Sequence, residues 1–252
     1  MKAKLCITIT FAALINFANF CLAEDFFVAP AISQEPNHLT PTSSYDTEYL
    51  RLIQKHLFTN RMNLGRFCSL PSFYGESCFE VNWKLNKVAQ NSYEQEVKNA
   101  DSELDKDLVP ISNDPKDRDY FITVASASKN LSYAENEETK SKTNSKVKIT
   151  RKTRAISKEL AAAIQRTWAK ILLQTKYPKS SYSGLDGVTY LFSVWIKNLG
   201  TLEGKTWSPR TGIVREIVEI GEAITTFASD TNGDEQPILK RLKNLESKID
   251  LS

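Results

Sequence analysis

The residues best suited to chemistry lie in one short run, Gly184-Leu185-Asp186-Gly187-Val188-Thr189-Tyr190. Asp186 could present a carboxylate and Tyr190 a phenol at the mouth of a cleft, and an outward carboxylate such as Glu216 could complete a hydrolase-like set. The run also suits a plain structural role. Gly-x-Asp-Gly is typical of a tight turn with positive φ, and the residues after it are ordinary strand residues. Because the sequence shows no partnering base or nucleophile, the enzyme stays the alternative interpretation.

Two tryptophans suggest a binding surface near the same run. Tyr190, Trp195 and Trp207 could together form an aromatic platform for a ligand. Aromatic residues on strands also commonly pack in the core or against neighbouring strands. We therefore carry Asp186, Tyr190, Trp195 and Trp207 forward as candidate binding residues and assign no catalytic residue.

Other familiar catalytic and metal motifs are missing from the sequence. The two histidines, His38 and His56, show no metal spacing, and there is no Gly-x-Ser-x-Gly motif, no phosphate-binding Gly-rich loop and no Rossmann fingerprint. The run from Asp230 to Glu235 resembles the opening of a calcium loop. However, Glu235 stands where that loop needs Gly, and Arg241 stands where it needs Glu. We expect no metal and no cofactor.

The cysteines indicate an oxidising compartment. Two of the four precede residue 24, which leaves Cys68 and Cys78 on either side of Pro71 and Gly75. This spacing predicts a disulfide that closes a surface loop. Zinc is the weaker alternative, because two thiols would need two further ligands.

The N-terminus is typical of a secretory signal peptide. Lys2 and Lys4 precede an apolar stretch from Leu5 to Phe20, and Cys21-Leu22-Ala23 predicts cleavage after Ala23. An uncleaved anchor is the alternative, but the stretch is shorter than the roughly 20 apolar residues that span a bilayer. No later stretch is long enough. We therefore expect a periplasmic or secreted protein with no membrane span after cleavage.

Charge gives little indication of a nucleic-acid partner. The chain has 33 basic and 30 acidic residues. The segment from Lys140 to Arg154 holds seven of the basic residues and no acidic one, so it could contact lipid phosphates or nucleic acid. Its alternation of lysine with Val147 and Ile149 equally fits a strand with one solvent-facing side. We expect no specific nucleic-acid ligand.

The hydrophobic pattern predicts the order of the helices and strands. A helix after Asp46 precedes strands at 78–85, 120–124 and 147–150, with a loop or weak helix at 94–107 and a long flexible loop near 129–145. The second half contains a helix after Ser157, strands at 188–195 and before Trp207, a helix after Ser208 or Thr211 and a helix from Pro237.

This order predicts an α+β fold, with an antiparallel sheet of four to five strands covered on one face by amphipathic helices. Residues 1–23 form the signal peptide, residues 24–44 are expected to be a mobile leader, and residues 45–252 are expected to form a single domain.

The second half of the chain also resembles a known group. Trp168, the run Gly184-Leu185-Asp186-Gly187-Val188-Thr189-Tyr190-x-Phe192 and Trp207-Ser208-Pro209 before a helix are similar to a pattern in uncharacterised bacterial exported proteins. The resemblance covers the C-terminal part of the chain from Trp168 onward. It implies a bacterial, Gram-negative source and an α+β arrangement, and it transfers no activity.

The sequence leaves two hypotheses for the function of the chain. The first is a periplasmic binding or interaction protein, such as an inhibitor or immunity-type partner of another exported protein. The second is a hydrolase-like enzyme with a carboxylate site near Asp186. A deep polar pocket around Asp186 would favour the enzyme, and an aromatic-lined surface would favour binding.

Overall fold

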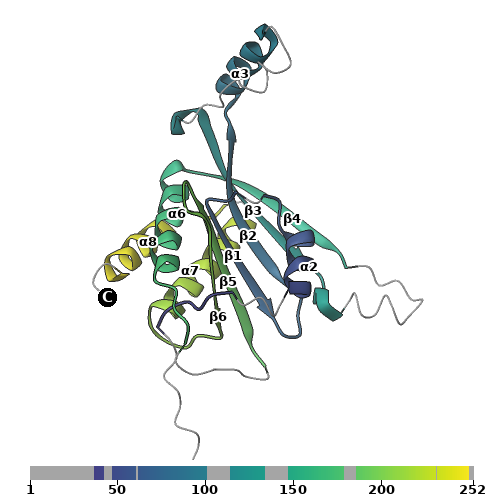
Figure 1. Cartoon of the computed structure of the whole chain (residues 1–252), viewed down its shortest axis with the longest axis vertical. Coiled ribbons are helices and arrows are strands. Elements are labelled where there is room, and N and C mark those ends of the chain that lie inside the picture. Colours follow the sequence, from purple (N-terminus) through teal and green to yellow (C-terminus); the bar gives the residue numbers. More distant parts are fainter. Residues whose placement is uncertain are drawn as a thin grey trace, which may run out of the picture. The chain divides into compact units, whose positions relative to one another are not determined.

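The structure, a computed structural model, describes residues 37–42, 47–60, 62–100, 114–133, 147–178, 186–230 and 232–249 (Figure 1). These residues belong to the unit from Glu35 to Ser252. The predicted signal peptide, most of the predicted leader, Asp46, Gly184-Leu185 and the basic residues before Val147 lie outside the described residues.

Six antiparallel strands form a single sheet in the order β4-β3-β2-β1-β5-β6. They are β1 Gly65–Pro71, β2 Ser77–Leu85, β3 Arg118–Ala127, β4 Ile149–Ile156, β5 Val188–Ile196 and β6 Gly200–Trp207. The α+β class is confirmed, but the expected four to five strands are one too few. The missed strand is β1, which is buried on both faces and carries Arg66, so it lacks the alternation of apolar and polar residues that marks a half-exposed strand.

The described part of the chain includes the α-helices α2 Thr47–Leu57, α3 Lys87–Asn99, α6 Lys158–Leu173, α7 Gly212–Ser229 and α8 Gln236–Ile249. A short 3₁₀ helix, Pro115–Asp117, precedes β3. Helix α3 begins earlier than the loop or weak helix expected at 94–107, because the side chain of Asn86 accepts hydrogen bonds from the amides of Val88 and Ala89. No residue of α3 is buried, and the helix follows the end of β2 (Figure 1).

One face of the sheet is covered by α6 and α7, with α8 packed against both helices, and we call it the helical face (Figure 1). Phe67, Phe79 and Phe192 point from three adjacent strands into this core and surround Trp168 of α6. The indole of Trp168 donates a hydrogen bond of 2.9 Å to the carbonyl oxygen of Arg66. The hydroxyl of Ser157 accepts from the amide of Leu160, so this predicted helix cap is confirmed.

The opposite face carries α2, and we call it the α2 face (Figure 1). Ile53 and Leu57 of this helix pack in a smaller core with Cys68 and Cys78. The two cysteines form a disulfide. The predicted disulfide is confirmed, and its buried cysteines lie directly opposite each other on β1 and β2, on either side of the exposed turn that carries Phe73 and Tyr74.

Residues 37–42 lie beside the outer strand β6. Leu39 is buried, and Thr40 pairs with Lys205 through two backbone hydrogen bonds of 2.7 and 2.8 Å. This part of the predicted leader therefore packs against the sheet. Across the described ranges, no helix is long and apolar enough to cross a membrane.

Candidate functional site

The residues of the hydrolase hypothesis make separate contacts. Asp186 is exposed. Tyr190 is buried on the helical face and donates a hydrogen bond of 2.9 Å to Glu222. Burial, followed by this hydrogen bond, raises the pKa of Tyr190 to about 12. Glu216 forms an ion pair of 2.7 Å with Lys248. The structure therefore does not bring the three groups together around one cavity.

The three aromatic candidates also lie apart. Side chains alternate between the faces of a strand, so Tyr190 lies on the helical face while Trp195 lies on the α2 face. Trp207 shares the α2 face, but it pairs with Thr189, six residues along β5 from Trp195. Six residues of a strand correspond to about 20 Å. The alternation of side chains along β5 and its pairing with β6 therefore prevent the three aromatic side chains from forming one binding surface.

Gly187 has a role other than the one expected from its turn motif. The described glycines with positive φ are Gly200 and Gly212, so Gly187 has no positive φ, while Gly184 of the same motif lies outside the described residues. A Cβ atom on Gly187 would lie 2.6 Å from the ring of Trp207. The motif therefore allows Trp207 to pack closely over the start of β5.

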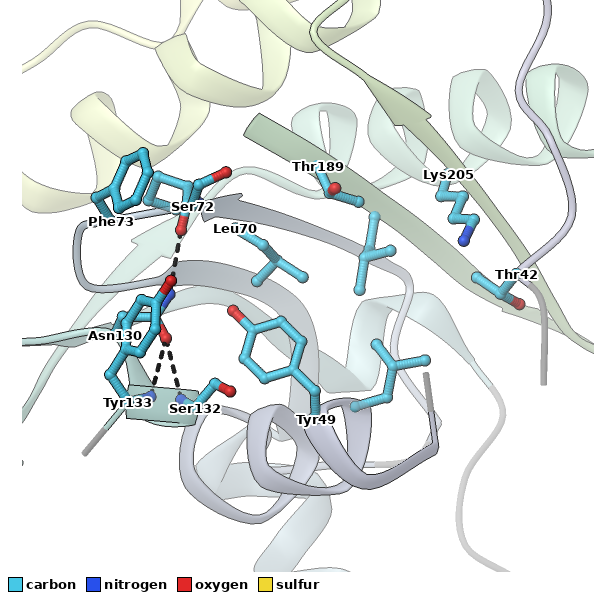
Figure 2. Close-up of a pocket in the computed structure, with 13 residues that line it drawn as sticks. Thr42, Tyr49, Leu70, Ser72, Phe73, Asn130, Ser132, Tyr133, Thr189 and Lys205 are labelled. Atoms are coloured by element: carbon cyan, nitrogen blue, oxygen red, sulfur yellow. Dashed lines mark hydrogen bonds between the residues drawn. The ribbon is translucent and has the colours of Figure 1, made fainter. Parts of the chain in front are cut away.

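A hollow of about 460 Å³ lies on the α2 face, between α2 and the strands β1, β5 and β6. This volume is within the usual range for ligand sites. Leu70, Leu191 and the ring of Tyr49 form the apolar part of its floor, and Thr189 and Lys205 also line it. Phe73 and Tyr133 lie at its mouth (Figure 2). Phe73 is 63% exposed and Tyr133 is 54% exposed, so both rings are open to an incoming partner.

One wall of this hollow is held by the buried carboxylate of Glu76. It accepts hydrogen bonds of 2.9 and 3.1 Å from the amide of Leu131 and one of 2.7 Å from the hydroxyl of Tyr49. The turn that carries Tyr133 is thereby fixed to α2. The wall is arranged before any ligand binds, which reduces the entropic cost of binding.

The neighbouring wall is fixed by two further side chains. Asn130 donates to the carbonyl oxygen of Pro71 and accepts from the amides of Ser132 and Tyr133 (Figure 2). The hydroxyl of Ser72 donates to the carbonyl oxygen of Gly187, 3.0 Å away. Most polar groups of this hollow are therefore engaged within the protein.

A second hollow, of about 510 Å³, lies at the C-terminal end of α2. A narrow gap of about 30 Å³ lies between the two hollows and shares lining residues with both of them. Thr42 and Leu50 also line the first hollow, whereas Gln54 and Glu203 also line the second. The three spaces form one groove along α2, which we call the α2 groove.

A buried ion pair lies beneath the α2 groove. The guanidinium of Arg66 contacts the carboxylate of Glu80 at 2.5 Å and lies 3.6 Å from the ring centre of Phe58. Glu80 also accepts from the amide and the hydroxyl of Thr59, and Arg66 donates to the carbonyl oxygen of Asn60. The pair thus ties the segment after α2 to the sheet.

The second hollow is lined by two cations of α2. Arg51 and Lys55 are exposed, one helical turn apart, and form no ion pair in the described part of the chain. Glu203 also lines this hollow and accepts a hydrogen bond from Thr42 at 3.3 Å. This end of the α2 groove is therefore basic, and it suits an anionic ligand group.

The same ranges offer little for catalysis or metal binding. They contain no group of three or more His, Cys, Asp or Glu side chains that could hold a metal ion. His56 lies on α2. His38 lies near β6, where burial and then the charge of Lys176 lower its pKa. The arrangement provides shape, aromatic contact and positive charge, which are features of a binding site.

No protein-family model matches the chain. Comparisons with curated proteins and with solved structures likewise found no match.

The sequence analysis missed most residues of the groove. Tyr49 lies in the helix predicted after Asp46, and Phe73 and Tyr133 lie in the loops predicted between Cys68 and Cys78 and near 129–145. One signal was present, because Phe73 and Tyr74 are large aromatic residues within the expected disulfide loop, where small polar residues are usual. The ion pair of Arg66 and Glu80 could not be found, since it depends on the strand that the sequence analysis missed.

Proposed function

We propose that the chain is an exported protein, periplasmic or secreted, that binds another exported protein through the α2 groove. The observation that carries this proposal is the hollow with its fixed walls and its exposed rings of Phe73 and Tyr133. Exposed aromatic residues beside a pre-arranged hollow are typical of the central contacts of protein interfaces.

The predicted signal peptide supports export, and the disulfide is compatible with an oxidising compartment. The resemblance to bacterial exported proteins is in accord with the same location. An inhibitor or immunity-type role would use such a surface to cover part of a partner protein.

The hydrolase alternative receives less support. It needs Asp186, Tyr190 and Glu216 around one substrate, whereas Tyr190 is bonded to Glu222 and Glu216 to Lys248. None of the three lines the α2 groove.

Site-specific photocrosslinking tests the proposal. A photoreactive phenylalanine analogue is placed at Phe73 in the full chain and, as a control, at Tyr177, which is 81% exposed and lies outside the groove lining. We expect a discrete protein adduct from position 73, lost when Thr189→Trp fills the hollow, and no such adduct from position 177. Equal adducts at the two positions, or none at position 73, would contradict the proposal.

A further inference from the structure

The two ends of the α2 groove differ in chemistry. The end beside Phe73 and Tyr133 has both apolar and polar side chains in its lining, Lys205 among them. Its polar side chains Ser72, Asn130 and Tyr49 are bonded within the protein, and Lys205 also has an interaction partner. A ligand rich in hydroxyl groups would find few free partners here. An apolar or aromatic side chain would instead gain contact with the floor and with the rings at the mouth.

The other end offers two exposed positive charges on α2. Arg51 and Lys55 are four residues apart on α2, and like charges at this spacing repel each other on a helix surface. Neither forms an ion pair in the ranges that the structure describes. A carboxylate-bearing ligand would offset this repulsion.

The length of α2 sets the length of the occupant. The helix has 11 residues, which at 1.5 Å per residue gives about 16 Å. An extended polypeptide rises about 3.3 Å per residue, so about five residues span the α2 groove from one end to the other.

We infer that the α2 groove binds an extended polypeptide segment that places an apolar or aromatic side chain in the hollow beside Tyr49 and acidic side chains on Arg51 and Lys55. The inference rests on the proposed function and adds the chemistry of the partner. Charge complementarity fixes the direction of the segment, with its acidic end toward the C-terminus of α2.

A random peptide library displayed on phage tests this inference. The purified full-length chain, with its disulfide intact, is the bait, and the double variant Phe73→Ala/Tyr133→Ala is the comparison bait. Both replaced side chains are exposed, so the variant should keep its fold. We expect enriched peptides to carry Asp or Glu within about five residues of an aromatic or large aliphatic residue.

The affinity of the best selected peptide is then measured by fluorescence anisotropy. We expect Arg51→Glu/Lys55→Glu to weaken binding by about tenfold or more, with a reduced dependence on salt. The matched control Lys84→Glu/Lys87→Glu reverses two exposed lysines outside the groove lining and should change the affinity less than about twofold.

The outcomes separate the two proposals. Peptides without acidic residues that depend on Phe73 and Tyr133, but not on Arg51 and Lys55, would overturn this inference and leave the proposed function standing. Peptides that bind all variants equally, or no enrichment over the double-alanine bait, would overturn both. Retention of an acidic polysaccharide such as alginate by the chain, lost in Arg51→Glu/Lys55→Glu while no peptide is selected, would show that the occupant is not a polypeptide.

Discussion

The helical face and the α2 face belong to the same six strands but are covered in different ways. On β1, Phe67 points into a core closed by α6, α7 and α8, while its neighbour Cys68 points toward the single helix α2. The helical face is filled with large apolar side chains. The α2 face combines a small apolar core with the buried pair of Arg66 and Glu80 and with an open groove.

This difference separates stability from recognition. Apolar packing usually stabilises a fold more than a buried ion pair of similar volume, because removing two charges from water is costly. We therefore expect the α2 face to contribute less to the free energy of unfolding than the helical face. Such a division is common where a surface must keep polar and exposed groups for a partner.

Trp168→Ala should show the largest effect, because it removes the central side chain of the helical face. We expect the free energy of unfolding to fall by about 4 kcal/mol, since the variant leaves a cavity and an unpaired carbonyl oxygen at Arg66. Urea denaturation measures the change. A loss below about 1 kcal/mol would contradict the leading role of this face.

Glu80→Gln tests the buried ion pair of the α2 face. We expect a loss of about 3 kcal/mol in the free energy of unfolding, because Arg66 remains buried without an opposite charge. The double variant Arg66→Met/Glu80→Leu should recover most of that loss, because it removes both charges. A double variant that is less stable than Glu80→Gln would show that the ion pair stabilises the protein in its own right.

The disulfide between Cys68 and Cys78 should make the next largest contribution to stability, on the α2 face. Cys68→Ala/Cys78→Ala should lower the free energy of unfolding by about 2–3 kcal/mol, since the unfolded chain regains its freedom. Reduction of the unaltered protein with dithiothreitol should give a similar loss and should not affect the variant. Equal stability of the oxidised protein and the variant would run against this expectation.

Tyr190 gives the helical face a pH dependence. Its pKa of about 12 in the folded protein exceeds the ordinary value of 10, so the folded chain keeps a proton that the unfolded chain loses. The stabilisation is present below pH 10 and is lost as the pH rises toward 12. Urea denaturation between pH 9 and 11.5 should show a smaller fall for Tyr190→Phe than for the unaltered protein, whereas Tyr133→Phe should match the unaltered protein.

Phe73→Ala and Tyr133→Ala should show the smallest effect on stability, below about 0.5 kcal/mol each, because both rings are largely exposed. They should nevertheless weaken partner binding strongly. Tyr177→Ala is the matched control, because it removes another exposed ring and should change neither property. A large loss of stability in Phe73→Ala would assign that ring to the fold rather than to recognition.

The sequence predicted the helical face better than the α2 face, for a physical reason. Apolar residues spaced by three or four positions mark α6, α7 and α8, because these helices bury one side. Alternation of apolar and polar residues marks β2, and β-branched and aromatic residues mark β5. Strand β1 has both sides buried and a charged Arg66 among them, so no simple period reveals it.

The groove could not be predicted at all, since it depends on which strands are neighbours. Tyr49, Leu70 and Leu191 are far apart in sequence, and they meet because β1 pairs with β5 while α2 crosses the same face. Tyr190 and Trp195 are five residues apart in the predicted strand 188–195, so alternation alone would have placed them on opposite faces. The place of Trp207, by contrast, depends on the pairing of β5 with β6.

Hydrogen–deuterium exchange of the chain with and without its crosslinked or selected partner tests the central claim most directly. The account predicts slower amide exchange in α2, around Phe73 and in the turn from Asn130 to Tyr133, with no change in α7 and α8. Protection confined to α7 and α8 would place the partner on the helical face and contradict the account.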